Sequence, residues 1–187
     1  MKKLVLIGLA FLITTSLSIL YAQKTVVRYA PDDDGTVYTS VEAALKAEKA
    51  VYRLKLTKLA NRDSLPEELF QLTELRELTV KGCRLCRLNQ NIGKLTKLQY
   101  LNLDHNKLLR LPESIGSLRQ LATIDAWGNP LYVLPNSIGE LRKTLRVLDL
   151  RQIPLTKWEY EAMEQLLPET DILFTDICEC ENRRDHD

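Results

Sequence analysis

The chain has 187 residues, with 26 Lys and Arg against 25 Asp and Glu, and 45% of its residues are hydrophobic. This is the composition of a globular protein, and it excludes a disordered or fibrous chain. The nearly balanced charge provides no basic field that would attract nucleic acid or an anionic membrane surface. The length suits one buried core or one repeat array rather than a recognition module joined to a catalytic domain.

The first 22 residues have the three-part build of a bacterial-type signal peptide. A positive start ends at Lys3, residues 4–13 form an apolar run, and a more polar stretch ends at Ala22. The run is shorter than the roughly 20 apolar residues of a stable membrane span. We therefore expect residues 1–22 to be cleaved. The mature chain would have a net charge of −1, no membrane span, and a place in the periplasm, on the cell surface or outside the cell.

Residues 23–50 are predicted to be an N-terminal capping segment with a short helix. Thr39 followed by Glu42 has the form of a helix capping box, in which each residue bonds a backbone N–H at the helix start. Val41, Ala44 and Leu45 are then spaced as the apolar face of the helix.

A period of 23 to 24 residues occupies the centre of the chain, in segments that begin at residues 51, 75, 98, 121 and 145. The central three read LRELTVKGCRLCRLNQNIGKLTK, LQYLNLDHNKLLRLPESIGSLRQ and LATIDAWGNPLYVLPNSIGELRKT. The fourth and sixth residues of each segment are apolar and alternate with mostly polar ones, which is typical of a strand with one buried face. One segment cannot bury that face alone, so we predict that the strands stack into a parallel sheet.

With its L-x-x-L-x-L-x-x-N/C-x-L pattern and its downstream L-P-x-x-I-G-x-L, the chain resembles the leucine-rich repeat family over roughly residues 51–174. The resemblance implies an α/β solenoid with a curved parallel sheet on its concave face and short helical or irregular segments on its convex face. Five repeats would fill residues 51–166, between helical caps at both ends. The ninth residue of a repeat, Asn106 or Asn129, is expected to satisfy backbone groups buried inside the turn.

The C-terminal part is predicted to close the array. Trp158, Ala162 and Leu166 recur every four residues, which indicates a terminal helix with this face turned inward. Residues 167–177 contain a short apolar run and are predicted to form a cap strand, and residues 178–187 a loose charged tail.

The four cysteines form two close pairs, Cys83 with Cys86 and Cys178 with Cys180. Disulfides remain open in an exported chain, whereas the spacing matches no usual zinc finger. Because Cys83 occupies the ninth position of its repeat, we predict a buried, inert thiol there and a more accessible Cys86.

The third, fifth, seventh and eighth residues of each repeat are expected to point outward from the concave face. Trp127 stands out because an outward aromatic side chain has no core to fill and such residues dominate binding hot spots. The structural alternative is that Arg151 only stacks on its ring, and Lys81 beside Asp104 indicates a solvated ion pair of small value. The candidate partner-binding residues are Tyr100, Asn102, Asp104, His105, Asp125, Trp127, Asp149 and Arg151.

Catalysis is not expected at this surface. Asp125 and Asp149 occupy one column and their carboxylates would lie about 5 Å apart, as in retaining glycosidases. A shallow strip, however, lacks the enclosure that would raise one carboxyl pKa, and Arg151 would favour ionisation of both. His105 is the only histidine in the repeats, so no Ser-His-Asp or Cys-His catalytic arrangement with two organised histidines is possible. A cation held between the two carboxylates is a minor alternative.

No cofactor or metal site is expected elsewhere in the sequence. The acidic run at residues 32–34 is predicted to be a turn, because a calcium-loop register would place Val41 where Glu is required. No glycine-rich phosphate loop is present.

The family resemblance implies a recognition scaffold. Five strands with four exposed residues each give a strip of about 300 Å², below the roughly 800 Å² per partner of a standard interface. We therefore predict a monomeric, non-catalytic exported module that binds a protein or peptide ligand, with a host protein as one candidate. No nucleic-acid binding is expected. The first alternative is a glycan-binding protein that uses Trp127 and Tyr100 with Asp125 and Asp149. The second is a structural role with self-association through the solenoid ends or the tail cysteines.

Overall fold

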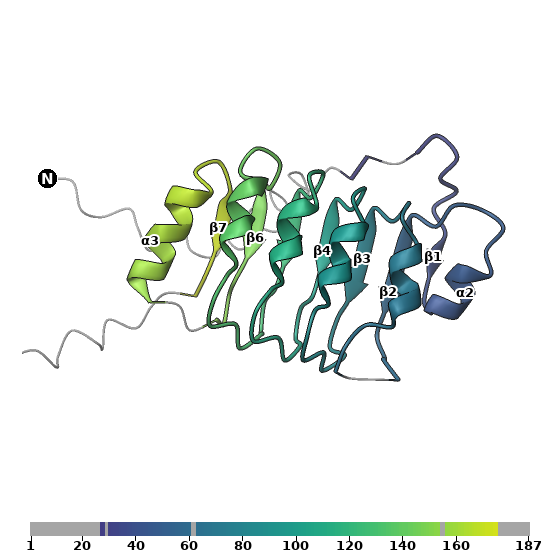
Figure 1. Ribbon diagram of the computed structural model, residues 1–187, viewed down its shortest axis with the longest axis horizontal. Helices are drawn as coiled ribbons and strands as arrows, with labels where there is room; N and C mark the ends of the chain where they lie inside the picture. The colour runs from purple at the N-terminus through teal and green to yellow at the C-terminus, as the bar shows by residue number, and fades with distance from the viewer. Residues whose placement is uncertain (1–26, 29, 61–62, 154–155, 176–187) are drawn as a thin grey trace, which may run out of the picture.

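The computed structural model describes residues 27–28, 30–60, 63–153 and 156–175. They form one parallel sheet of seven strands in chain order, stacked side by side along the length of the molecule (Figure 1). The predicted signal peptide and the tail cysteines lie outside the described residues. The strands are β1 (Val37–Tyr38), β2 (Arg53–Leu56), β3 (Glu77–Val80), β4 (Tyr100–Asn102), β5 (Thr123–Asp125), β6 (Val147–Asp149) and β7 (Asp171–Leu173).

The predicted strand alternation is confirmed. The fourth and sixth residues of all five repeats are buried, from Leu54 and Leu56 to Leu148 and Leu150. Neighbouring strands pair with equivalent positions opposite each other, as with Leu101 and Ile124. A one-residue shift would expose this whole set of apolar residues, so burial fixes the register.

The second wall consists of one short 3-10 helix in each of the first four repeats. These are η1 (Glu67–Gln71), η2 (Gln90–Lys94), η3 (Glu113–Ser117) and η4 (Asn136–Leu141), which lie on one face of the sheet (Figure 1). The isoleucines of η2, η3 and η4, such as Ile115, are buried, and η1 buries Leu69 and Phe70 instead. The glycine after the isoleucine permits close stacking, because a Cβ on Gly116 would lie 2.5 Å from the Ser137 carbonyl oxygen.

The ninth-position asparagines are buried and connect neighbouring repeats, as predicted. The Asn106 Oδ1 accepts from the backbone N–H groups of Cys83 and Leu85, both at 3.0 Å. Its Nδ2 donates to the carbonyl oxygens of Val80 and Leu103 at 2.6 and 2.8 Å. Asn129 repeats the arrangement one coil later, with Leu108 as donor and Leu103 and Ala126 as acceptors.

The N-terminal cap differs from the prediction in its start and its extent. Helix α2 (Val41–Leu45) begins after Ser40, whose side chain accepts from the Ala43 N–H at 3.2 Å. Thr39 is therefore not the N-cap, because the helix starts one residue later than the capping-box pattern indicated. Ala44 is the buried residue of this helix. The unpredicted strand β1 adds an edge to the sheet by pairing with β2, and residues 32–34 form the predicted turn region.

The C-terminal helix α3 (Lys157–Leu166) is present, but the predicted buried face was wrong. Thr156 and Glu159 form a capping box at its start. Met163 is the residue that the helix buries, whereas Trp158 is 79% exposed and Leu166 is also exposed. The helix therefore presents the side of Met163 to the array, a face that a search for four-residue recurrence missed. The predicted closing strand is β7, paired with β6.

The thiols of the first close pair are both free. Cys83 is buried, as predicted, and burial raises the pKa of its thiol. Cys86 is partly exposed. Within the described residues, no helix has the length and apolar character needed to cross a membrane.

Candidate functional site

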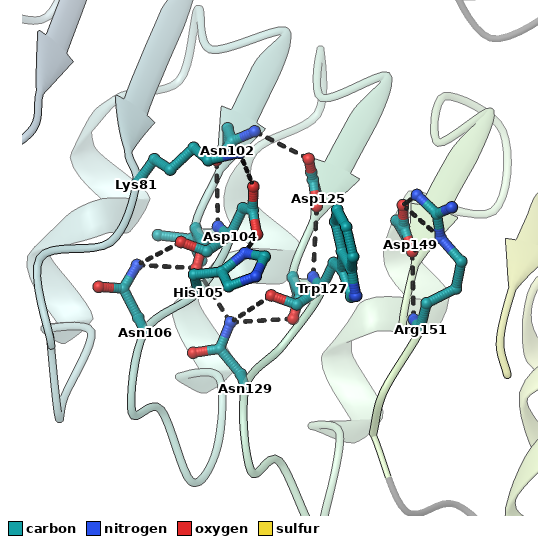
Figure 2. A network of polar contacts seen from close by, with 12 residues as sticks. Lys81, Asn102, Asp104, His105, Asn106, Asp125, Trp127, Asn129, Asp149 and Arg151 are labelled. Carbon is teal, nitrogen blue, oxygen red and sulfur yellow. Dashed lines mark hydrogen bonds and ion pairs between the residues drawn. The ribbon is translucent and has the colours of Figure 1, made fainter. Parts of the chain in front are cut away.

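The candidate residues lie on the open face of the sheet, the face opposite the 3-10 helices. The fifth repeat positions form one column, in which Asn102 pairs with Asp125 and Asp125 with Asp149. Figure 2 shows Asn102 and Asp125 in a polar network with Lys81, Asp104, His105 and Trp127, and Asp149 paired with Arg151 on the far side of Trp127. The Tyr100 hydroxyl joins it at 3.3 Å from the Asn102 amide nitrogen. The open-face cluster comprises Tyr100, Lys81, Asn102, Asp104, His105, Asp125, Trp127, Asp149 and Arg151.

Three side chains of this column fold back onto their own backbone. A side-chain oxygen of Asn102, Asp125 and Asp149 accepts from the N–H two residues later, at 3.0, 3.2 and 3.1 Å. This local bond is typical of Asn and Asp where a strand ends and the chain turns. The cluster is thus built partly by repeated turn chemistry.

The expectation that all eight candidates are exposed was wrong for three of them. Asn102, Asp104 and Asp149 are buried, the last two at only 1% exposure. Asn102 and Asp149 are drawn inward by their turn bonds, and Arg151 and Lys81 cover the two carboxylates with ion pairs. Thr123 and Val147, also expected on the surface, are buried as well.

Asp104 lies at the centre of a charged group. The Lys81 ammonium forms an ion pair with its carboxylate, and the His105 Nδ1 contacts the other carboxylate oxygen. The hydrogen bond to Asp104 raises the pKa of Lys81. The sequence predicted this pair as fully solvated, but Asp104 is buried while Lys81 remains half exposed. The pair is therefore less screened than a surface ion pair.

Trp127 is held between two side chains from neighbouring repeats. The Arg151 guanidinium lies 4.9 Å from the Trp127 ring centroid, which confirms the predicted cation–π contact. The edge-on His105 ring lies 4.8 Å away on the preceding turn. Trp127 is mostly buried, with only part of its side chain exposed, and its indole Nε1 is buried without a hydrogen-bond partner among the described residues. Arg151 is held in place by Asp149, because its Nε and Nη2 donate to the two Asp149 carboxylate oxygens at 2.9 and 2.6 Å.

Asp125 has no ion-pair partner within the described part of the chain. Its Oδ2 accepts from the Asn102 amide at 2.8 Å and its Oδ1 from the Trp127 N–H. Burial raises the pKa of Asp125 to about 6, and the negative charges of Asp149 and Asp104 add to the rise. The expectation that a shallow strip would leave this carboxyl unshifted was wrong, because Trp127 and its neighbours enclose it.

The left-handed backbone at the eighth repeat position shapes the same surface. Gly82, His105, Gly128 and Gln152 have φ angles of 65, 53, 67 and 60°. Glycine adopts this conformation without strain, whereas a side chain does so only at some cost. At His105 the turn brings the imidazole ring against both Asp104 and Trp127.

This arrangement is suited to recognition through an aromatic ring and a carboxyl group. No group of three or more His, Cys, Asp or Glu side chains among the described residues is placed to hold a metal ion. Asp125 and Asp149 are neighbours but differ in their partners, since Asp149 forms an ion pair with Arg151 and Asp125 accepts from the Asn102 amide. The prediction that Arg151 would favour ionisation of both carboxyls is wrong for Asp125, because burial raises the pKa of that carboxyl.

Sequence reasoning missed a second surface, on the loops between strands and 3-10 helices. Leu109, Tyr132 and Val133 are all exposed there. The available signal was their position beside buried leucines such as Leu108 and Leu131, which leaves no core for them to fill.

Comparisons with known proteins place this geometry in a family. No curated protein matches the chain. A solved structure of a leucine-rich repeat protein from Leptospira interrogans matches with 23% sequence identity and a TM-score of 0.49. The match covers 76% of this chain and 49% of the Leptospira protein, so this chain spans about half the length of that protein. A family model described as a leucine-rich repeat region matches residues 63–167, more than half of the chain. The chain therefore belongs to the leucine-rich repeat family.

Proposed function

We propose that the mature chain is an exported, non-catalytic module that binds a protein or peptide ligand at the open-face cluster. The observation that carries the proposal is the partly exposed Trp127 beside a carboxyl group, Asp125, that forms no ion pair in the described chain. Its neighbours Asp104 and Asp149 each have one. Asp125 can therefore still bind a cationic group of a ligand, whereas the neighbouring carboxylates are already paired within the protein.

The aromatic ring is pre-organised for binding. Arg151 and His105 contact Trp127 from neighbouring repeats, and Arg151 is fixed in turn by Asp149. A ligand that packs on such a ring need not order a mobile side chain, which lowers the entropic cost of association. Tryptophan and arginine are also the residues most enriched in binding hot spots.

Asp125 favours a ligand with a Lys or Arg side chain. A cation placed beside this carboxyl group would favour its ionised form and lower its raised pKa. Binding of such a ligand is therefore expected to strengthen as the pH rises through about 6. The small strip of exposed sheet suits a short peptide or a peptide-like segment of a protein.

The structure favours a peptide over the glycan alternative. Arg151 lies over the Trp127 ring, where a sugar would need an open face. Asp149 is buried and engaged by Arg151, so it cannot serve as a free acceptor for sugar hydroxyls without breaking that pair.

A peptide selection tests the proposal. Random 12-residue peptides are displayed and selected on immobilised residues 23–187, and the affinities of enriched peptides are measured by fluorescence anisotropy. We expect Trp127→Ala to weaken binding at least about tenfold, as for a hot-spot residue. Trp158→Ala, which removes an exposed tryptophan outside the cluster, is the matched control and should leave the affinity within about twofold.

The same variants separate the alternatives. Enriched peptides that bind wild type and Trp127→Ala equally would reject the open-face site. Binding of a glycan array that is lost in Trp127→Ala, with no peptide enriched, would replace the proposal with the glycan function. Circular dichroism of each variant excludes loss of the fold as the cause.

Export is tested separately. The full chain is expressed in a bacterial host, and the mass of the product in the periplasm or medium is measured. We expect cleavage after Ala22, so that the mature chain begins at Gln23. Retention of an uncleaved chain in the cytoplasm would reject the signal peptide.

A further inference from the structure

A second surface lies along the loops that connect each strand to its 3-10 helix. These loops are stacked on the lower side of the molecule in the view of Figure 1. We name this surface the loop edge and define it by six exposed residues of repeats two to four, namely Arg87, Lys107, Leu109, Arg110, Tyr132 and Val133.

The loop edge is ordered by its own backbone hydrogen bonds. The Lys107 N–H donates to the Leu85 carbonyl at 2.9 Å, and the Tyr132 N–H donates to the Leu109 carbonyl at 3.2 Å. Arg110 and Val133 also form a parallel bridge. The exposed side chains of successive repeats are therefore stacked at about the 4.8 Å spacing of strands, and little backbone entropy remains to be lost on binding.

Three apolar side chains of the loop edge are solvent-exposed. Leu109 is 52% exposed, Tyr132 57% and Val133 48%. The adjoining Leu108 and Leu131 are buried and already fill the core beneath them. Contiguous exposed apolar side chains with no role in the core are typical of interaction sites.

The cations beside these apolar side chains are unpaired. Arg87, Lys107 and Arg110 are exposed, and none forms an ion pair within the described part of the chain. The open-face cluster differs, since its cations Lys81 and Arg151 are both paired. Two acidic residues lie in the same loops. Asp63 lies one repeat before Arg87, whose N–H donates to the Asp63 carbonyl at 2.9 Å. Asp104, three residues before Lys107, is buried and paired with Lys81.

We propose that the loop edge binds an acidic segment of another protein, one in which Asp or Glu side chains flank a large apolar side chain. Arginine binds carboxylates through paired N–H groups, and the three unpaired cations provide the complementary charge. Tyr132 and Leu109 would cover the apolar side chain of the segment, since aromatic residues carry much of the binding energy of an interface. This surface is separate from the open-face cluster and does not depend on a ligand there.

The experiment uses two peptide libraries and residues 23–187. Each ten-residue peptide of the first library contains four Asp or Glu and three Leu, Phe or Tyr. The second library replaces each acid with Lys. We expect retention of the acidic library only, and a Kd that rises at least about tenfold for the double variant Arg87→Glu, Arg110→Glu. Higher salt should weaken wild-type binding, and Tyr132→Ser should weaken it at every salt concentration.

The matched control reverses two exposed cations elsewhere. Arg142 and Lys143 follow η4, on the loops that lead into the strands, so Arg142→Glu with Lys143→Glu changes the net charge equally without altering the loop edge. The control should retain wild-type affinity. An equal loss of affinity in both double variants would mean that binding depends only on net charge, and it would overturn the proposal.

Three further results would also overturn it. These are equal binding of the two libraries, no binding of either library, and binding that is lost in Trp127→Ala but retained in the loop-edge variants. Phosphatidylglycerol vesicles are tested in parallel. Vesicle binding that depends on Arg87 and Arg110, without peptide binding, would assign the surface to a membrane instead.

Discussion

Two polar columns cross the same central repeats, and they differ in how completely their groups are satisfied. Asn106 and Asn129 form the buried column, in which both the oxygen and the nitrogen of each amide are bonded to backbone groups. The open-face cluster is also rich in hydrogen bonds, yet Asp125 has no cation and the Trp127 Nε1 has no acceptor in the described chain. Full satisfaction indicates a structural role, whereas the incompletely satisfied column is where a ligand can add contacts.

The largest expected effect is in the buried column. Asn106→Ala removes five hydrogen bonds and leaves the buried N–H groups of Cys83 and Leu85 without their acceptor. The Leu103 and Asp104 carbonyl groups lose one donor each but keep a second, from the Asn129 amide and the Gly82 N–H. Each unsatisfied buried group costs about 1–3 kcal/mol, so we expect a loss of about 4 kcal/mol in the free energy of unfolding. Urea unfolding at pH 7 measures it.

The control for this variant is Asn91→Ala, which removes an exposed hydrogen bond to Glu67. It should cost less than about 1 kcal/mol. A loss below about 1.5 kcal/mol for Asn106→Ala would mean that water replaces the amide and that the two columns do not differ in kind.

The next effect concerns the buried ion pair of the open-face cluster. Lys81→Met leaves the Asp104 carboxylate, which is 1% exposed, without its ammonium partner. An uncompensated buried charge is strongly destabilising, and the half-exposed position of Lys81 together with the remaining His105 contact reduces the expected cost to about 2 kcal/mol. A double-mutant cycle with Asp104→Asn, measured by urea unfolding, isolates the coupling. Strictly additive losses would show that the pair is as weakly coupled as a surface ion pair.

The sequence predicted the buried column better than the open-face cluster. The ninth position identified Asn106 and Asn129 because a small amide inside a turn has one dominant use, the satisfaction of backbone groups. Period-two alternation likewise located β2 to β6. Strand alternation alone, however, assigned Asn102 and Asp149 to the surface, because it does not include side chains that bend back to bond their own turn.

The caps show the same limit on what a sequence pattern can predict. Helix α3 begins and ends near the expected residues, but which face is buried depends on how the helix docks on the array. Met163 rather than Trp158 is buried, and no local spacing determines that choice. The short strand β1 was missed because two residues carry no detectable period.

A smaller effect is expected in the pH dependence of stability. The pKa of Asp125 is about 6 in the folded protein, against an ordinary value of 3.8 for an aspartate side chain. The folded chain therefore retains a proton that the unfolded chain has lost at intermediate pH. The contribution of Asp125 to the free energy of unfolding is therefore fully present below about pH 4 and is lost as the pH rises through about 6. For a partly exposed carboxyl we expect a contribution of about 1 kcal/mol.

Asp125→Asn provides the comparison for this measurement. The variant also loses one hydrogen bond, because its amide nitrogen would face the Asn102 nitrogen, but that cost does not depend on pH. The difference between wild type and variant in the free energy of unfolding is measured at several pH values from 4 to 7.5. Wild type should lose stability relative to the variant as the pH rises, and a constant difference would show that Asp125 titrates normally.

The smallest expected effect on stability is at Trp127. Trp127→Phe removes the buried indole N–H that lacks an acceptor, and it retains an aromatic ring for Arg151 and His105. The cation–π contact weakens by a fraction of its roughly 0.5–1 kcal/mol, while loss of an unsatisfied buried donor offsets this cost. We therefore expect a change in the free energy of unfolding within about 0.5 kcal/mol by urea titration.

The comparison at Trp127 separates packing from recognition. Trp158→Phe, on the exposed side of α3, provides the baseline for the loss of a tryptophan that contacts little. A cost near 2 kcal/mol at Trp127 but not at Trp158 would make the Trp127 ring part of the core. A small cost at both positions, together with weaker peptide binding only for Trp127→Phe, would assign the ring to the ligand. Its side chain would then contribute least to the stability of the cluster and most to its function, the opposite of Asn106 in the buried column.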